Sequence, residues 1–292
     1  MADHFPEILC PVDLSAHSQV ALGFAAAIAD HFKARLSILY VMRSTLHVVD
    51  HDRIDRSVQL FARPVVQRLA RFDLPRVLVR TGTPADVILG TAAAKCSDLV
   101  VMATHGAGAS ARVYGSTTAE ILRRSPVPVL VIPPALLRVP TADVEHMMAR
   151  ARTILAPIDF HSRATADARI ANAIASAFGV PLVLLHVASS ADAHVSARAA
   201  LDTIAGRFGG KFEVVVVSGD VAEETGRLAL ERGAGLIVMG LRGDRGRVGS
   251  APGSIAWRVL ARAPVPILAL PGAPTETPAG LIVDAAAAVQ GA

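Results

Sequence analysis

Short apolar runs alternate with longer amphipathic segments along this chain. Runs rich in Val, Ile and Leu predict strands, and segments with apolar residues at helical spacing predict helices. In the first half, we expect strands at Ile8–Val12, Leu36–Val41, Val77–Arg80, Leu99–Ala103 and Val127–Ile132. The helices expected between them are His17–Phe32, Ser57–Phe72, Ala85–Lys95 and Ser116–Arg124. This alternation is typical of βα units that build a parallel sheet.

The second half of the chain repeats the first. The segment that starts at Ile8 reappears from Ile154, an offset of 146 residues, and Thr81 matches Ser218 at an offset of 137. The first copy therefore holds about nine extra residues before Thr81. The polar segment Arg43–Asp55 is the expected place for them.

The repeat predicts an α/β fold of two tandem Rossmann-like domains. In the second copy, we expect strands at Ile154–Ile158, Leu182–Val187, Phe212–Val217, Leu236–Met239 and Val265–Leu270. Each domain should hold a five-stranded parallel sheet flanked by four helices. The expected organisation is a first domain at 1–135, a linker with a short helical piece at 136–150, a second domain at 151–272 and a tail at 273–292.

Composition and charge narrow the class of protein. Apolar types make up 52% of the chain and charged types 18%, which excludes a disordered chain. A net charge of +4 and an aromatic content of 4% argue against a nucleic-acid-binding surface. No segment approaches the ~18 continuous apolar residues of a membrane span. With no cationic start before an apolar run, we expect a cytoplasmic protein that binds no membrane.

Candidate chemistry lies where strands end, because ligands of open parallel sheets bind at the carboxyl ends of the strands. The first strand of each copy ends in Pro-x-Asp, with the carboxylates of Asp13 and Asp159 just past a buried strand. Each carboxylate could accept hydrogen bonds from a ligand. The alternative is that each aspartate caps the following helix, in competition with Ser15 or Ser162.

A glycine-bracketed loop follows the fourth strand of the second copy. It reads Gly240-Leu-Arg-Gly243, then nine residues, then Gly253-Ser254 at the start of a helix. Glycines let the backbone approach a ligand, and the first free amides of a helix attract anions, so the loop suits a phosphate. A plain connecting loop is the alternative. It matches neither a Walker loop nor the dinucleotide fingerprint.

Taken together, these motifs and the closing Pro-Val-Pro-Ile-Leu strand resemble the universal stress protein family, over about residues 5–135 and 151–272. The resemblance implies ATP as ligand, with or without Mg²⁺, and an adenine contact from Asp159. It implies a nucleoside pocket lined by Pro157, Ile158 and Val187. Ribose and phosphates would be held by Gly240, Arg242, Gly243, Gly253, Ser254 and Ile255.

The first copy departs from this pattern. Its loop starts with Ala103 in place of glycine and is one residue shorter before Gly115, which moves the later amides. We therefore expect nucleotide in the second copy ahead of the first. The equivalent candidates in the first copy are Pro11, Val12, Asp13, Val41, Ala103, His105, Gly106, Gly115, Ser116 and Thr117.

The resemblance also implies how the copies meet. The closing strands are apolar and would be sheet edges in isolated domains, and exposed apolar edges invite pairing. Members of the family pair these strands across a twofold axis, so we expect an intramolecular pseudo-dimer, with or without a further homodimer.

Other chemistry-bearing residues have simpler interpretations. His47, Asp50, His51 and Asp52 have no defined metal-ligand spacing, so a polar contact loop is favoured over a metal site. We expect His186 to be a hydrogen-bonded core residue and Cys10 and Cys96 to be buried thiols. Arginines at the helix ends, Arg123, Arg124, Arg258 and Arg262, should complement the negative helix termini.

The functional prediction is a nucleotide-binding protein of the stress response rather than an enzyme. No nucleophile-and-base signature stands out, although slow hydrolysis of bound ATP stays open. One alternative is an interaction module whose loops bind nothing. Another is a division of labour in which only the second copy binds ATP.

Overall fold

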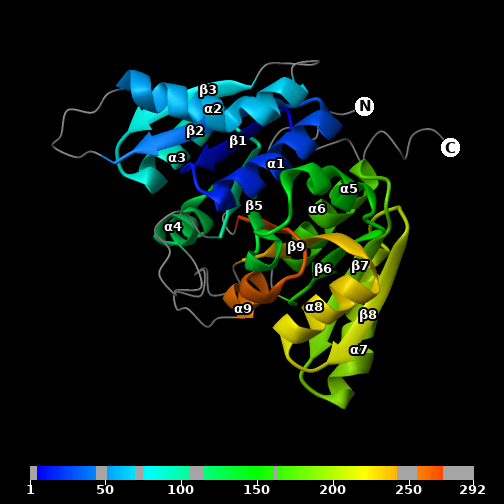
Figure 1. Ribbon diagram of the computed structural model, residues 1–292. Helices are drawn as coiled ribbons and strands as arrows, with labels where there is room; N and C mark the ends of the chain where they lie inside the picture. Colours follow the sequence, from blue (N-terminus) through cyan, green and yellow to red (C-terminus); the bar gives the residue numbers. More distant parts are fainter. Residues whose placement is uncertain are drawn as a thin grey trace, which may run out of the picture.

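Ten strands form one continuous sheet. The computed structural model describes residues 5–43, 51–69, 75–104, 115–160, 163–241 and 255–271. The strand order is β3-β2-β1-β4-β5-β10-β9-β6-β7-β8. In Figure 1 the first copy, blue to cyan, lies above the second, and β5 lies between the two halves.

The first copy forms the expected parallel α/β unit. Its strands are β1 (Glu7–Val12), β2 (Arg35–Met42), β3 (Arg76–Thr81), β4 (Leu99–Ala103) and β5 (Val129–Ile132). Its helices are α1 (Ala16–Phe32), α2 (His51–Leu69), α3 (Pro84–Ala94) and α4 (Ser116–Arg124). The segment expected to hold the insertion is helical from His51 onward, and residues 44–50 lie outside the described part.

The second copy has the same order of elements. Its strands are β6 (Thr153–Pro157), β7 (Leu182–Ala188), β8 (Phe212–Ser218), β9 (Ala234–Gly240) and β10 (Ile267–Leu270). Its helices are α6 (Ala164–Ala177), α7 (Ala191–Ala205), α8 (Val221–Glu231) and α9 (Ile255–Arg262). The predicted α/β class with two Rossmann-like units is confirmed.

The two copies join through an antiparallel pair, β5 with β10. Leu130 lies opposite Leu268, Val129 opposite Ala269 and Val131 opposite Ile267. Leu130 and Leu268 are equivalent positions of the repeat, at an offset of 138. A pseudo-twofold axis therefore passes between these two leucines, and the expected intramolecular pseudo-dimer is built on strand pairing.

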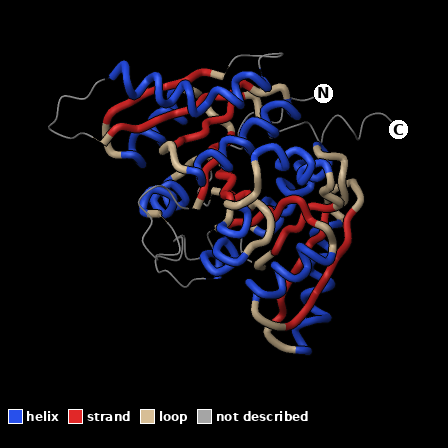
Figure 2. Tube along the Cα trace, viewed as in Figure 1, coloured by secondary structure: helices blue, strands red, loops and turns tan. Residues whose placement is uncertain are grey.

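The helices cover both faces of the sheet, as Figure 2 shows for the strands and helices of both halves. One hydrophobic core includes Phe24 of α1, Ala62 of α2 and Leu201 of α7. The other includes Ile88 of α3 and Leu260 of α9. In each copy the first two helices thus lie on one face and the last two on the other.

The linker packs onto the first copy. It forms two short 3₁₀ turns, Pro134–Leu136 and Thr141–Asp143, followed by α5 (Val144–Ala149). The side chain of Val144 is fully buried. Gly23 of α1 lies so close to the linker that an added Cβ would stand 2.7 Å from Cγ2 of Thr141. The predicted short helical piece is present, and it belongs to the core beside α1.

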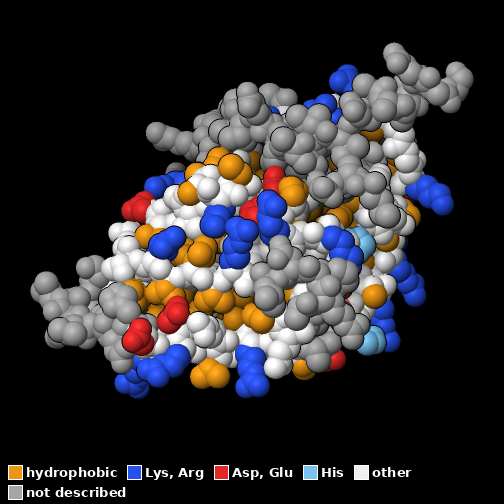
Figure 3. Space-filling view, turned by 90° about the horizontal axis from the view of Figure 1, so that it is seen from above, with side chains coloured by type: hydrophobic (Ala, Val, Ile, Leu, Met, Phe, Trp, Pro, Cys, Tyr) orange, Lys and Arg blue, Asp and Glu red, His pale blue; other side chains and the backbone are white. Residues whose placement is uncertain are grey.

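Charged side chains on the face in Figure 3 are interspersed with other types. Lys and Arg lie there in separate groups among hydrophobic and acidic side chains. Among the described helices, none is long and apolar enough to cross a membrane.

Candidate functional site

The sheet reverses its direction of winding at two places. In the first copy β1 pairs with both β2 and β4, and in the second copy β6 pairs with both β7 and β9. Helices that follow the paired strands leave toward opposite faces, which opens a crevice at the strands' carboxyl ends. The Pro-x-Asp motif and the start of the glycine-bracketed loop therefore meet at one place in each copy.

Asp159 presents an exposed carboxylate at the second of these crevices. Strand β6 ends at Pro157, and the amide of Ile158 donates a hydrogen bond of 2.7 Å to the Leu185 carbonyl. Asp159 is exposed and has no hydrogen-bond partner among the described residues. Helix α6 starts at Ala164, well past this aspartate, so the alternative that Asp159 caps the helix is not supported.

Asp13 is engaged in its own turn. Its Oδ1 accepts hydrogen bonds from the backbone amide of Ser15 at 3.1 Å and from the Ser15 hydroxyl at 2.5 Å. Ser15, in turn, caps α1 by accepting from the amide of Ser18 at 3.1 Å. Leu14 between them adopts a left-handed φ of 62°. Asp13 thus supports the helix cap, and Ser15, the other candidate for the capping residue, provides it.

Gly240 meets a buried carboxylate. It ends β9 without a left-handed φ, so its backbone conformation does not require glycine. An added Cβ would lie 2.3 Å from Oδ2 of Asp167, a residue of α6 that is 5% exposed. The Asp167 Oδ1 lies 3.9 Å from Nε of Arg163. The glycine is therefore needed for close approach to Asp167, a residue that sequence patterns did not single out.

The first copy fills the same place with methyl groups. Ala103 ends β4 where the second copy has Gly240, and Ala21 stands where the second copy has Asp167. Both alanines are buried. Exchange of Asp167 for Ala21 makes room for the side chain of Ala103, so the alanine at the loop entrance is compensated by a second change.

The start of α4 is held against the end of β4. The amide of Gly115 donates to the Thr104 carbonyl at 2.9 Å, and Oγ1 of Thr118 donates to the Ala103 carbonyl at 3.0 Å. Ser116 is exposed and, with Thr117, lines a groove. The other residues that line this groove are Arg43, Gly82, Thr83, Pro84, Ala85 and Glu120.

Some of the predicted site residues lie in the described part of the chain and others lie outside it. Pro11 and Pro157 are half-buried in their strands, Val12 and Ile158 are buried, and Val41 and Val187 are half-buried. Ile255 opens α9 and is 51% exposed. Six predicted residues lie outside the described part of the chain: His105, Gly106, Arg242, Gly243, Gly253 and Ser254.

An aromatic pair beside Asp159 was not predicted. The Phe160 ring is 40% exposed, and its centroid lies 4.4 Å from that of His186 on β7. Nδ1 of His186 is hydrogen-bonded to the Ile158 carbonyl at 2.8 Å. The hydrogen bond expected of His186 is confirmed, but the ring is half-buried at the strand's end rather than in the core. An aromatic residue directly after Pro-x-Asp was the available signal.

The arginines near the helix ends form ion pairs between neighbouring helices. Arg124 of α4 pairs with Asp86 of α3 at 2.8 Å, and Arg262 of α9 pairs with Glu223 of α8 at 3.0 Å. Both arginines lie in the last turn of their helices, where they were expected, and each also forms one of these ion pairs. In both copies, the helix that follows the loop is tied to the helix before it.

Arg258 adds a further tie in the second copy. It forms a hydrogen-bonded ion pair with Asp220, whose Oδ1 caps α8 by accepting from Ala222 at 3.0 Å and Glu223 at 3.2 Å. The hydrogen bond from Arg258 lowers the pKa of Asp220 below its ordinary value.

Metal-ligating side chains do not gather in the described ranges, where no group of three or more could hold a metal ion. His47 and Asp50 lie outside those ranges. The two cysteines differ: Cys10 is buried, which raises the pKa of its thiol, whereas Cys96 is exposed, contrary to the expectation of a buried thiol.

Comparisons with known proteins identify relatives of both copies. The sequence model of the universal stress protein family matches residues 4–133 and 150–271. A universal stress protein of Thermus aquaticus, encoded beside a QAH/OAS sulfhydrylase, is 28% identical over 135 residues, which cover 44% of this chain and 98% of that protein.

Solved structures resemble the whole chain. A universal stress protein from Archaeoglobus fulgidus is 21% identical with a TM-score of 0.70, over 91% of this chain and 96% of that one. A protein of unknown function from Pseudomonas aeruginosa is 16% identical with a TM-score of 0.65, over 96% of both chains. At these identities, the likeness shows the fold.

Proposed function

The chain belongs to the universal stress protein family as a tandem member, and from that premise we propose that its second copy binds an adenine nucleotide, with ATP as the first candidate. The observation that carries this proposal is that the exposed Asp159 carboxylate and Gly240, where the loop begins, lie at the ends of neighbouring strands at one switch point of the sheet. Parallel sheets bind ligands at such points.

Three described residues of the second copy would contact the nucleotide. Asp159 would accept a hydrogen bond from the exocyclic amine of adenine, a donor that a carboxylate suits. The Phe160 ring, exposed beside it, offers an apolar face to the nucleoside. Ile255 starts α9, whose free amides would donate to phosphate oxygens.

The role that we propose is binding rather than catalysis. Mg²⁺ would enter chelated by the phosphates. One histidine and serine pair has the residue types of a base and a nucleophile: the side chains of His194 and Ser218 are hydrogen-bonded at 2.7 Å. Ser218, however, is exposed at the end of β8, an edge strand two places from β6, where Asp159 follows. Nucleotide occupancy would act by changing contacts with a protein partner in a cytoplasmic stress response.

A division of labour between the copies is the second candidate function. The hydrogen bonds that Asp13 makes to Ser15 favour it, because Asp13 would have to exchange them for those of a ligand. In this alternative, only the second copy binds nucleotide and the first serves as its packing partner.

Calorimetry with matched variants tests both candidates. Nucleotide released from a heat-denatured sample of the purified protein is assayed first, and ATP, ADP, AMP and cyclic AMP are then titrated into the folded full chain. Asp159→Asn should weaken ATP binding by about tenfold, the loss expected for one hydrogen bond to a charged group. Asp13→Asn, the matched control, should leave the tighter binding event unchanged.

The outcomes separate the hypotheses. No heat with any nucleotide at millimolar concentration rejects nucleotide binding and favours an interaction module. One binding event per chain favours the division of labour, whereas two events favour a nucleotide in each copy. Unchanged affinity in Asp159→Asn rejects the assignment of Asp159.

A further inference from the structure

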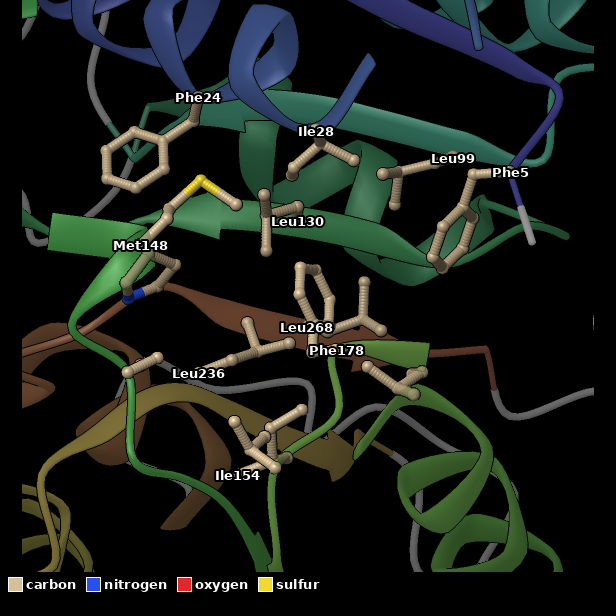
Figure 4. A pocket seen from close by; sticks show the side chains of 15 residues that line it. Phe5, Phe24, Ile28, Leu99, Leu130, Met148, Ile154, Phe178, Leu236 and Leu268 are labelled. Atoms are coloured by element: carbon tan, nitrogen blue, oxygen red, sulfur yellow. The ribbon is translucent and has the colours of Figure 1, made fainter. Parts of the chain in front are cut away.

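The sheet is paired through its centre and has a free edge at each of its two ends. At the seam, apolar side chains of both copies line a common space, Leu130 and Leu268 among them (Figure 4), and none of the lining residues is charged. The free edges of the sheet, among the described strands, are β3 and β8. We propose that the β3 edge is a docking site for an acidic, extended segment of a partner protein, which adds to the sheet as a further strand.

The backbone of β3 offers hydrogen-bonding groups to such a segment. The amide of Gly82, directly after β3, donates to the Met42 carbonyl of β2 at 2.9 Å. Because the backbone groups of successive strand residues point to opposite sides, the amides and carbonyls of Val77, Val79 and Thr81 point away from β2. A row of backbone groups at a free edge is a template on which an extended chain can pair.

Two arginines give this edge a positive charge. Arg76 and Arg80 are exposed, and neither has an ion-pair partner among the described residues. Side chains four positions apart in a strand lie on the same face, so both guanidinium groups stand on one side of β3. They attract carboxylates of an added strand and repel a second copy of β3.

The other face of β3 borders a groove between this strand and α2. Val77 lines the groove together with Leu60 and Val66 of α2 and with Pro75, which precedes the strand. The side chain of Leu60 is 66% exposed, so it would lose contact with water if a strand lay along the groove. Every second side chain of that strand would face the groove, where apolar types fit best.

Arginines of α2 add positive charge to the apolar groove. Arg63 lines it and has no ion-pair partner in the described part of the chain. Arg56 also lines it, and its Nε donates to the Asp52 backbone carbonyl at 3.1 Å. The carboxylates of α2, Asp52 and Asp55, are not among the lining residues. Figure 3, which looks down on the side where α2 and β3 lie in Figure 1, shows Lys and Arg beside hydrophobic side chains.

The β8 edge of the second copy differs in charge. At the repeat offset of 137, Glu213 stands where the first copy has Arg76, and Val217 stands where it has Arg80. Glu213 is paired with Arg232 at 2.9 Å. Of the two edge strands, only β3 carries positive side chains, and only this edge selects an acidic partner.

A peptide suits the β3 edge better than a nucleic acid does. Phosphates would also be attracted to the arginines, but a nucleic acid has no row of amides and carbonyls that pairs with a strand. Single exposed ion pairs contribute little, so backbone pairing and apolar contact supply the affinity and the arginines select the partner. The two faces of β3 therefore predict acidic residues, facing Arg76 and Arg80, that alternate with apolar residues facing Leu60.

Fluorescence anisotropy on the full chain tests the proposal with a labelled peptide of alternating glutamate and valine, as long as β3. We expect saturable binding that weakens as salt is added. A peptide of alternating lysine and valine should not bind. The glutamate-valine peptide with N-methylated backbone amides should not bind either, because it lacks the donors for β3. Binding of either control peptide with the affinity of the glutamate-valine peptide overturns the proposal, and so does tighter binding of oligothymidine.

Charge-reversal variants locate the peptide. Arg76→Glu combined with Arg80→Glu should weaken binding of the glutamate-valine peptide by about tenfold or more, because attraction becomes repulsion at both positions. Arg169→Glu combined with Arg207→Glu makes the same change in net charge at two exposed residues of the second copy and should bind as wild type. Asp159→Asn should also bind as wild type, because docking at β3 does not depend on the proposed nucleotide site. Wild-type affinity of the β3 variant overturns the proposal.

Hydrogen exchange on the unmodified chain requires no substitution. With the glutamate-valine peptide bound, the amides of Val77, Val79 and Thr81 should exchange at least several-fold more slowly, because they gain acceptors. The amide of Gly82, already bonded to Met42, is the internal control and should change much less. Unchanged exchange at the three outward amides overturns strand addition.

Discussion

The two copies are compared best at two places: the seam, which is the antiparallel pair of β5 and β10, and the switch points of the sheet. At the seam, equivalent residues meet across the pseudo-twofold axis, as Leu130 meets Leu268. At the switch points the copies differ, with Ala103 over Ala21 in one and Gly240 over Asp167 in the other. The leucine at the centre of the β5–β10 pair is the same in both copies, whereas the pair of residues at the switch point differs.

The largest expected effect tests the symmetry of the seam. Leu130→Ala and Leu268→Ala each remove a side chain that is at most 3% exposed. Each should lower the free energy of unfolding by about 2–5 kcal/mol, from lost burial and the space left behind. Urea unfolding measures both. If one variant is much less stable than the other, the two sides of the seam are not equivalent.

The next effect tests the asymmetry of the switch points. Gly240→Ala directs a methyl group at the buried Asp167 carboxylate and should cost about 1–3 kcal/mol of stability. The double variant Gly240→Ala with Asp167→Ala recreates the pair of the first copy and should be more stable than the sum of the single changes predicts.

Ala103→Gly is the matched control for this pair. It removes a methyl group that has room in the first copy and should cost only about 0.5–1 kcal/mol. Additive effects of Gly240→Ala and Asp167→Ala would show that the two residues do not compete for space.

A smaller effect compares two helix caps. Ser15→Ala removes the cap of α1 and a hydrogen bond to Asp13, and should cost about 1 kcal/mol. Ser190→Ala at α7 should cost less, because its cap hydrogen bond is longer, 3.4 Å against 3.1 Å. Thermal unfolding of both variants ranks them, and the reverse ranking would contradict the role of the Asp13 turn.

The smallest effect is a pH dependence of opposite sign in the two copies. Burial raises the pKa of Asp98, whose Oδ2 accepts from the Glu7 amide at 3.0 Å. Its protonated form thus favours the fold, and this contribution is lost as pH rises from about 3.9 through the folded-state pKa. Asp98→Asn should remove that loss while keeping the acceptor oxygen.

Asp220 in the second copy supplies the comparison. Because Arg258 lowers its pKa, Asp220 contributes stability that is present above about 3.9 and is lost as pH falls through the folded-state pKa. Urea unfolding of the wild type and of the variants Asp98→Asn and Asp220→Asn between pH 3 and pH 7 measures both contributions, each as the slope of the wild type minus the slope of one variant. Slopes of the same sign would contradict these assignments.

The apolar runs of the sequence predicted the strands, because the strands form a sheet that helices cover on both faces. The predicted strands differ from the observed ones at their ends. β5 and β10 begin at Val129 and Ile267, later than predicted, just after Pro128 and Pro266. Proline has no amide to donate to a strand partner, which delays regular pairing. Apolarity alone could not show this.

The spacing of motifs along the sequence predicted only part of the candidate site. Pro-x-Asp placed Asp13 and Asp159 at strand ends, but not the different use of their carboxylates, which depends on Ser15 and a local turn. The contact between Gly240 and Asp167 joins residues from β9 and α6. It comes from packing between elements, for which a single sequence holds no periodic signal.

The antiparallel seam has a consequence for how the two halves can diverge. A dimer of separate identical chains must change both sites whenever it changes one. Here β5 and β10 pair within a single polypeptide, so each half always meets the other and never a copy of itself. One half is free to specialise while its neighbour keeps the shared sheet intact.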